Sequence, residues 1–108
     1  MKNEVLERIS REVQDNDVVL YMKGSAAFPQ CGFSAAIVQI LESLGIPFVT
    51  VDVLGNATLR QALKEFADWP STPQLYIKGE FVGGCDIVRE MHSAGELHAF
   101  LAEKGILR

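Results

Sequence analysis

The order of apolar patterns along this chain predicts an α/β fold built on a small mixed sheet. Helical patterns alternate with short strand-like runs through residues 2–67, which is typical of parallel strands joined by helices. A hairpin pattern follows at residues 74–82, and two helical segments come after it. We therefore expect a four-stranded mixed sheet flanked by about five helices, with the first two strands parallel and the hairpin adding antiparallel pairing.

The first helix and the first strand differ in their periodicity. Within residues 2–14, apolar side chains recur every three or four positions, as on one face of a helix. Residues 18–22 instead form a continuous apolar run after the turn-forming sequence "DND", which predicts a buried strand. Gly24 marks the loop that follows this strand. The apolar positions of the first helix are Val5, Leu6, Ile9 and Val13.

The second helix is predicted directly after a cysteine. Residues 29–34 read "PQCGFS", and the strong helix formers of residues 35–44 carry a broad apolar face. Gly45 stands where a left-handed helix C-cap is expected. The pattern therefore places Cys31 at the N-terminus of a helix.

The next two elements complete a second strand–helix unit. Residues 47–53, "PFVTVDV", predict the second strand, and Asn56 is suited to cap a third helix that runs to residue 67. Arg60 and Lys64 lie one turn apart on a face of this helix that is separate from its apolar face. The positions expected to face inward are Leu59, Leu63 and Phe66.

The remaining segments predict the hairpin and two final helices. Residues 74–82 form the clearest hairpin pattern in the chain, with its turn at Lys78 and Gly79. Asp86 is expected to cap the next helix, which runs to about residue 93. A last helix is expected over residues 96–104 and is ended by Gly105.

Length and composition exclude several classes of protein. The 108 residues predict a single domain, 1–108, and 48% apolar with 22% charged residues is typical of a globular protein. A net charge of -4 argues against nucleic acid or an anionic membrane as the partner. The longest apolar run, residues 18–22, is far below the roughly 20 residues that span a bilayer. The amino terminus has no apolar signal core, which predicts a cytoplasmic protein.

Cys31 is the candidate reactive group. A thiol at the first turn of a helix meets unpaired backbone N–H groups, which favour the thiolate and lower the pKa of the thiol. Lys23, at the end of the preceding strand, would add a second positive charge. The alternative is a buried structural cysteine, since free cysteine is among the most buried residue types. Cys31 and Cys85 are far apart in sequence and have no second Cys or His at ligand spacing, which disfavours a zinc site.

Five sequence blocks, in order, carry a resemblance to a known family. They are "KG" at 23–24, "CGFS" at 31–34, "WPSTPQLY" at 69–76, "GEF" at 79–81 and "GGCD" at 83–86. Together they resemble the monothiol, CGFS-type glutaredoxins over nearly the whole chain. The resemblance implies a thioredoxin fold, which the predicted order of elements allows.

The resemblance also implies a glutathione site around Cys31. Read without it, Arg60 and Lys64 fit a solvated helix face, Asp86 fits a helix cap, and Trp69 fits core or edge packing. The implied contacts are Lys23, Arg60 and Lys64 for the glycine carboxylate, Phe33 in the motif, the Thr72 backbone before a cis Pro73 for the cysteinyl part, and Gly84, Cys85 and Asp86 for the γ-glutamyl group.

A serine at the last position of the motif restricts what Cys31 can do. Ser34 cannot resolve a mixed disulfide, because a hydroxyl does not displace sulfur as a thiolate does. One remaining function is a glutathione-dependent disulfide oxidoreductase, expected to be weak, in which external glutathione resolves the intermediate. The function that the resemblance implies is a carrier of a labile [2Fe–2S] cluster for cluster transfer and iron homeostasis. An interaction module with an inert Cys31 is a third class.

The resemblance implies that the cluster lies between two chains. A [2Fe–2S] cluster takes four thiolates, which two chains and two glutathione molecules would supply together. The chain would then be a homodimer with the cluster and a monomer without it, and BolA-like proteins and apo iron–sulfur proteins would be its protein partners. Cys85 either pairs with Cys31 under oxidation or serves as a small residue at a tight helix start.

Overall fold

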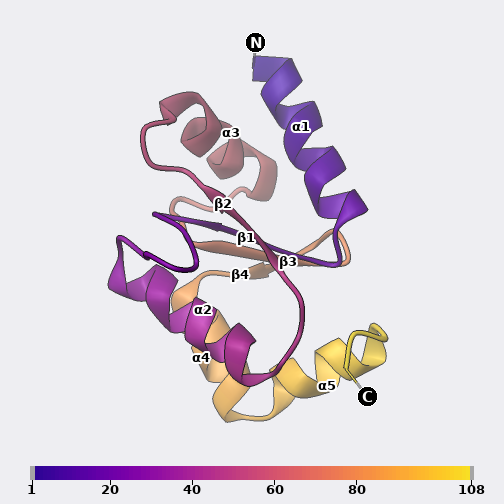
Figure 1. The fold of residues 1–108 in the computed structure, drawn as a ribbon. Coiled ribbons are helices and arrows are strands. Elements are labelled where there is room, and N and C mark those ends of the chain that lie inside the picture. Colours follow the sequence, from indigo (N-terminus) through magenta and orange to yellow (C-terminus); the bar gives the residue numbers. More distant parts are fainter. Residues whose placement is uncertain (1, 108) are drawn as a thin grey trace.

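The computed structural model describes residues 2–107, which form one four-stranded sheet with helices on both faces (Figure 1). The predicted domain, 1–108, therefore includes one residue at each end that lies outside the described residues. The elements are α1 (Lys2–Asp15), β1 (Val18–Met22), α2 (Gly32–Ser43), β2 (Val49–Asp52), α3 (Ala57–Ala67), β3 (Gln74–Ile77), β4 (Glu80–Gly83), α4 (Cys85–Ser93) and α5 (Glu96–Glu103).

The sheet has the mixed topology that the sequence predicts. Its strand order is β2-β1-β3-β4. β1 and β2 are parallel, whereas β3 is antiparallel to both of its neighbours. In Figure 1, α1 and α3 lie on one face of the sheet, and α2 and α4 lie on the other. This is the arrangement expected when helices connect parallel strands and then cover both faces.

β1 has two buried faces, which explains its continuous apolar sequence. All five of its residues are buried. Leu20 and its alternate neighbours join a core cluster with α2, α4 and α5, while Val19 and Tyr21 join a second cluster with α1 and α3. Side chains of a strand alternate between faces, so a central strand between two helix layers buries the side chains of both faces.

Three details of the helices differ from the sequence prediction. α2 begins at Gly32 rather than Ala35, so the motif itself forms the first turn. Gly84, not Asp86, is the N-cap of α4, and Asp86 lies in its first turn. Phe66 is not buried as predicted: it is 37% exposed, and its ring lies 5.9 Å from that of Tyr76, measured between centroids. Asn56 caps α3 as predicted, by accepting a hydrogen bond from the Leu59 N–H.

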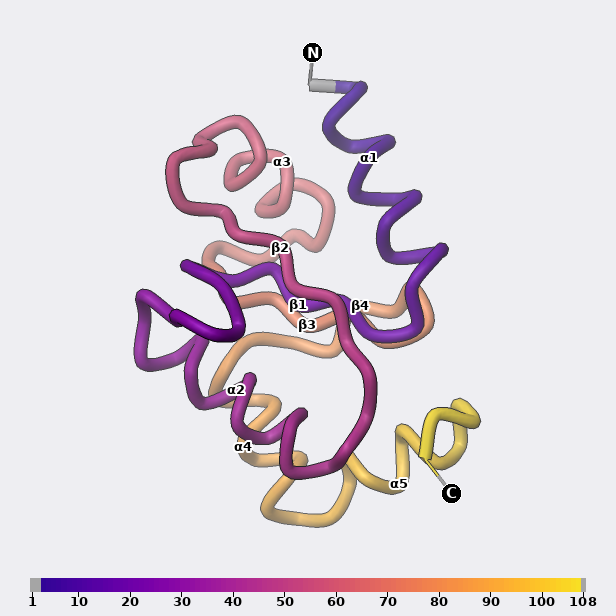
Figure 2. Tube along the Cα trace, viewed as in Figure 1, coloured from indigo at the N-terminus to yellow at the C-terminus, as the bar shows by residue number. Residues whose placement is uncertain are grey.

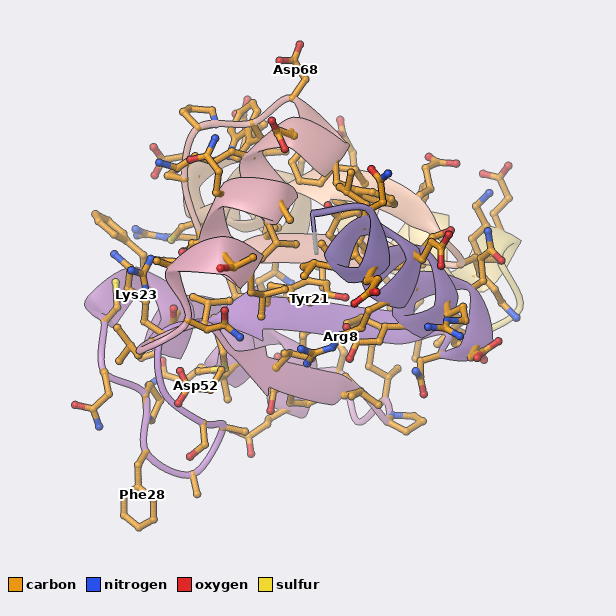
Figure 3. The ribbon with its side chains drawn as sticks, turned by 90° about the horizontal axis from the view of Figure 1, so that it is seen from above. Arg8, Tyr21, Lys23, Phe28, Asp52 and Asp68 are labelled. Atoms are coloured by element: carbon orange, nitrogen blue, oxygen red, sulfur yellow. The ribbon has the colours of Figure 1, made fainter. Side chains whose placement is uncertain are left out.

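The loop between β1 and α2 lies at one end of the molecule. Figure 2 shows this loop on the left, while α5 lies at the lower right. The view from above in Figure 3 again separates the two, with Lys23 and Phe28 on the left and α5 on the right. The fold therefore presents the cysteine motif at an end of the sheet that α5 does not cover.

Candidate functional site

Cys31 is the N-cap of α2. Its backbone is extended, and its carbonyl accepts the first helical hydrogen bond, from the Ala35 N–H at 2.9 Å. The thiol makes no cap hydrogen bond and is partly exposed to solvent. The site therefore offers a free thiol beside the unpaired N–H groups of a helix start.

The environment of Cys31 lowers the pKa of its thiol. The backbone N–H of Ser34 is the largest cause, and the Phe33 N–H, the charge of Lys23 and the Ser34 hydroxyl act in the same direction. Desolvation by partial burial opposes them. Positive dipoles and charges stabilise the thiolate more than the thiol, so the helix start activates this sulfur as the sequence predicts.

Ser34 is a structural residue of the same turn. Its side chain is 0% exposed, and its Oγ accepts a hydrogen bond from the Lys23 N–H at 3.2 Å. The hydroxyl therefore links the first turn of α2 to the end of β1. This link holds the backbone of Lys23 beside the cysteine-bearing turn.

Hydrogen bonds close the loop between Lys23 and Gln30. The Gln30 N–H donates to the Lys23 carbonyl at 2.9 Å, and the Gly24 N–H donates to Asp52 Oδ1 at 3.0 Å. Gly24 has φ +88°, and a Cβ there would lie 2.5 Å from the Phe28 carbonyl oxygen, so the position requires glycine. Figure 3 shows Lys23, Asp52 and Phe28 on the same side of the molecule, with Phe28 projecting outward.

A first cavity of about 260 Å³ lies between the start of α2, the loop before β3 and the start of α4. The Thr72–Pro73 peptide bond in its wall is cis, as the family resemblance implies. Gly84 permits a close approach, because a Cβ there would lie 3.3 Å from both the Pro73 carbonyl oxygen and Trp69 Nε1. The cavity is lined by Phe33, Trp69, Ser71, Thr72, Pro73, Gly84, Cys85, Asp86 and Ile87.

The start of α4 supplies backbone donors to this first cavity. Gly84 is an extended N-cap without a side chain, so no side chain satisfies the first N–H groups of the helix. Asp86, in the first turn, is exposed, and Cys85 is buried at 8% exposure. An uncapped helix N-terminus next to a carboxylate can receive both the anionic and the cationic group of an amino acid.

A second cavity, of about 190 Å³, is cationic. It is lined by Lys23, Arg60, Lys64, Pro70, Ser71 and Thr72. Arg60 is held in place by a hydrogen bond from its Nη1 to the Val53 carbonyl oxygen at 2.8 Å. None of the ion pairs recorded among residues 2–107 involves these three cations. The second cavity therefore has positive charge available for an anionic ligand.

The structure brings the predicted site residues together around Ser71 and Thr72, which line both cavities. Cys31 itself lines neither cavity. Lys23, however, lines the second cavity and also lowers the pKa of the Cys31 thiol, so that thiol lies within electrostatic reach of the cavity. Each of the other residues predicted for the site lines at least one cavity: Lys23, Phe33, Arg60, Lys64, Thr72, Pro73, Gly84, Cys85 and Asp86.

The sequence interpretation missed part of the wall. Trp69, expected in packing, does pack against Phe81 at 5.6 Å between ring centroids, but it also lines the first cavity. A signal was present, because Trp69 lies outside any apolar periodicity and begins the block "WPSTPQLY". Pro70, Ser71 and Ile87 were missed as well: Pro70 and Ser71 belong to the block "WPSTPQLY", whereas no sequence signal distinguishes Ile87 from an ordinary helix residue.

Residues 2–107 contain neither a clustered metal site nor a membrane-spanning helix. No group of three or more His, Cys, Asp or Glu side chains in this range is arranged to hold a metal ion. Within the same range, every helix is too short or too polar to cross a membrane.

Comparisons with known proteins define the family. The glutaredoxin family model matches residues 18–82. A probable monothiol glutaredoxin 2 from Rickettsia typhi is 49% identical over 104 residues, covering 96% of this chain and 94% of the relative. A chloroplastic monothiol glutaredoxin-S7 from rice is 56% identical over 99 residues; the match covers 92% of this chain but 58% of that relative's length.

Solved structures of glutaredoxins share the fold of this chain. The solution structure of reduced poplar apo GrxS14 is 52% identical, has a TM-score of 0.81, and is matched over 90% of this chain and 89% of that one. The fold and the thiol at the start of α2 thus define a thioredoxin-fold protein of the glutaredoxin class. More narrowly, the chain belongs to the monothiol glutaredoxin family.

Proposed function

We propose that this chain binds glutathione beside Cys31 and carries a labile [2Fe–2S] cluster to other proteins. One observation carries the proposal: the accessible thiol of Cys31 has a lowered pKa and lies within electrostatic reach of the second, cationic cavity. That cavity shares a wall with the first cavity. The last position of the motif holds a buried hydroxyl, so the site contains no second thiol of the motif to resolve a disulfide.

The chemistry of the two cavities fits the two ends of glutathione. Lys23, Arg60 and Lys64 would bind the glycine carboxylate, because charge-assisted hydrogen bonds to a carboxylate are the strongest that these side chains make. The uncapped N-terminus of α4 would bind the γ-glutamyl carboxylate, and Asp86 would bind its ammonium group. The Thr72 backbone, which borders both cavities, would pair with the cysteinyl part between them.

The thiol count of the chain supports a shared cluster. A [2Fe–2S] cluster takes four thiolates, whereas this chain has two cysteines, and Cys85 is buried. One Cys31 from each of two copies and one thiol from each of two bound glutathione molecules would complete the set. The loaded form would then be a homodimer and the apo form a monomer. Because half of the ligands are small molecules, the cluster is cargo that can be released to apo iron–sulfur proteins or passed to BolA-like partners.

A second function, glutathione-dependent disulfide reduction, is favoured by the lowered pKa of Cys31 alone. The Cys31 thiolate would attack the glutathione sulfur of a glutathionylated protein and release the protein thiolate. A second glutathione would then attack the Cys31–glutathione disulfide, giving oxidised glutathione and regenerating the Cys31 thiolate. We rank this activity second and expect it to be weak.

Anaerobic reconstitution with iron, sulfide and glutathione tests the proposal. We expect visible cluster absorption that co-elutes with a dimer in size exclusion and needs both glutathione and Cys31. Cys85→Ser is the matched control, since it removes a thiol outside the proposed ligand set and should load normally, whereas Cys31→Ser should stay colourless and monomeric. A colourless wild-type monomer that rapidly reduces glutathionylated substrates would instead establish the second function.

A further inference from the structure

Gln74 carries a buried amide next to the wall shared by the two cavities. It is the first residue of β3, follows Pro73, and is 0% exposed. Its Nε2 lies 3.4 Å from the Leu63 carbonyl oxygen and 3.3 Å from the Ser71 carbonyl oxygen. Its Oε1 accepts a hydrogen bond from the Tyr76 hydroxyl at 2.9 Å. A fully buried amide costs free energy unless its donors and acceptor are paired, and here all of them have partners.

Two carbonyl groups and the Tyr76 hydroxyl set the orientation of this amide. The Tyr76 side chain is 1% exposed, and burial raises the pKa of its phenol, so the phenol keeps its proton and acts as a donor. Gln74 Oε1 accepts the hydrogen bond from this hydroxyl, while the two Nε2 hydrogens face the two carbonyl groups. The opposite orientation would place Oε1 against two carbonyl oxygens, neither of which has a hydrogen to donate. The amide is therefore held in one orientation by its surroundings.

The two carbonyl partners belong to different parts of the site. Leu63 lies on α3 between Arg60 and Lys64, which supply the cations of the second cavity. Ser71 lies in the loop before β3 and borders both cavities. The Gln74 side chain thus joins the cation-bearing helix to the loop that divides the cavities. Both contacts are long, so each bond is weak by itself, but they act together on one short segment.

We propose that Gln74 is a positioning residue whose amide holds the Ser71–Thr72 backbone at a fixed place relative to α3. The consequence for binding rests on the proposed glutathione site. The cations of α3 and the Thr72 backbone would already be in place for the two parts of glutathione before it binds. A preorganised site binds more tightly because less freedom is lost on binding. Without the amide, the loop would still exist, but the Ser71 carbonyl would lose its side-chain partner on β3.

Gln74→Met tests this role, because methionine has a similar shape and cannot donate to either carbonyl group. Trp69, the only tryptophan in the chain, lies two residues before Ser71 and lines the first cavity, so its fluorescence reports on this loop. We expect acrylamide to quench Trp69 about twice as effectively in the variant. Glutathione affinity should fall by about tenfold, equivalent to about 1.4 kcal/mol.

Ile77→Val is the matched control. Ile77 is fully buried at the far end of β3, so losing one methylene lowers the midpoint of unfolding without touching the loop. We expect this variant to keep wild-type quenching and wild-type affinity. If Gln74→Met behaves like this control, losing only stability, the positioning role is wrong. Should Gln74→Met not fold, Gln74→Asn keeps an amide in the core but is one methylene too short to serve both carbonyl groups, and the same two readouts apply.

The two readouts separate this proposal from the glutathione site itself. If wild-type protein binds no glutathione while Gln74→Met still raises the quenching of Trp69, the loop is positioned by Gln74 and the proposed ligand is wrong. If wild-type protein binds glutathione and both Gln74 variants bind it equally well with unchanged quenching, the ligand stands and the role of Gln74 is overturned.

Discussion

At the scale of single residues, the reactivity of Cys31 comes from backbone geometry more than from charged neighbours. The Ser34 N–H is the main cause of the lowered thiol pKa, and among the other groups that lower it the Phe33 N–H comes before the Lys23 charge. The first N–H groups of a helix have no partner within the helix, so they can stabilise a thiolate without breaking a helical hydrogen bond. Ser34 adds to this by holding Lys23 through its backbone, which leaves the Lys23 side chain free for the second cavity.

The pH dependence of Cys31 alkylation follows from this geometry. We expect the rate of reaction with iodoacetamide, measured in a Cys85→Ser background, to rise with a midpoint below the ordinary thiol pKa of about 8.5. Lys23→Gln should move the midpoint upward, because a positive charge near the thiolate is lost. The folded state favours the thiolate of Cys31, so this thiolate stabilises the fold at pH values above the pKa of an unfolded cysteine. The stabilisation is lost as the pH falls through the lowered pKa of Cys31 in the folded protein. A midpoint at or above 8.5 would contradict the assignment of Cys31 as an activated thiol.

At the scale of elements, the loop between β1 and α2 and the helix α3 are built to present fixed groups. The loop is closed onto itself by backbone hydrogen bonds and tied to Asp52 at the end of β2. α3 is capped by Asn56 and holds Arg60 against the carbonyl of Val53. Each element therefore carries its cation on a rigid support, which is what a specific carboxylate site requires.

The loop between β1 and α2 gives a prediction about stability, and a nearby glycine at the start of α2 serves as the control. Gly24→Ala should lower the free energy of unfolding by about 2 kcal/mol or more, because the new Cβ meets backbone atoms and φ is positive. Gly32→Ala is the matched control: a Cβ there meets nothing within 4 Å, and alanine in the first turn of α2 should be neutral or stabilising by up to about 1 kcal/mol. Urea denaturation of both variants measures the difference. Equal stabilities would show that the loop relaxes around Gly24.

α3 gives a prediction about charge. Arg60→Glu should weaken glutathione binding by about tenfold or more, because a carboxylate would replace a guanidinium in the second cavity. Arg89→Glu makes the same change of charge on the exposed part of α4, beside neither of the two cavities, and should leave the affinity within about twofold. Isothermal titration of both variants at two salt concentrations separates local contact from general electrostatics. Equal losses in the two variants would remove Arg60 from the site.

At the scale of the whole molecule, the sequence predicts the scaffold well and the site walls less well. The continuous apolar run of β1 and the helical spacing of α1 are set by burial, so they can be recognised without the structure. Gly84 as the cap of α4, the outward position of Phe66 and the wall position of Trp69 depend on how distant segments meet. The bonds of Gln74 to Leu63 and Ser71 join segments up to 11 residues apart, and no local pattern encodes them. Local periodicity therefore predicts elements, whereas the contacts between elements decide the shape of the site.

The division of the site into two cavities predicts how ligand fragments stabilise the fold. A ligand that binds only the folded state raises the free energy of unfolding by RT ln(1 + [L]/Kd), which is about 1.4 kcal/mol when the ligand is present at about ten times Kd. Glutathione should therefore raise the melting temperature of the cluster-free protein in proportion to the logarithm of its concentration. γ-Glutamylcysteine lacks the glycine carboxylate, so it should stabilise less and be insensitive to Arg60→Glu. Cysteinylglycine lacks the γ-glutamyl group, so it should also stabilise less but keep its sensitivity to Arg60→Glu. Thermal unfolding in the presence of each compound measures these differences, and fragments that respond identically to Arg60→Glu would mean that one cavity, not two, holds the peptide.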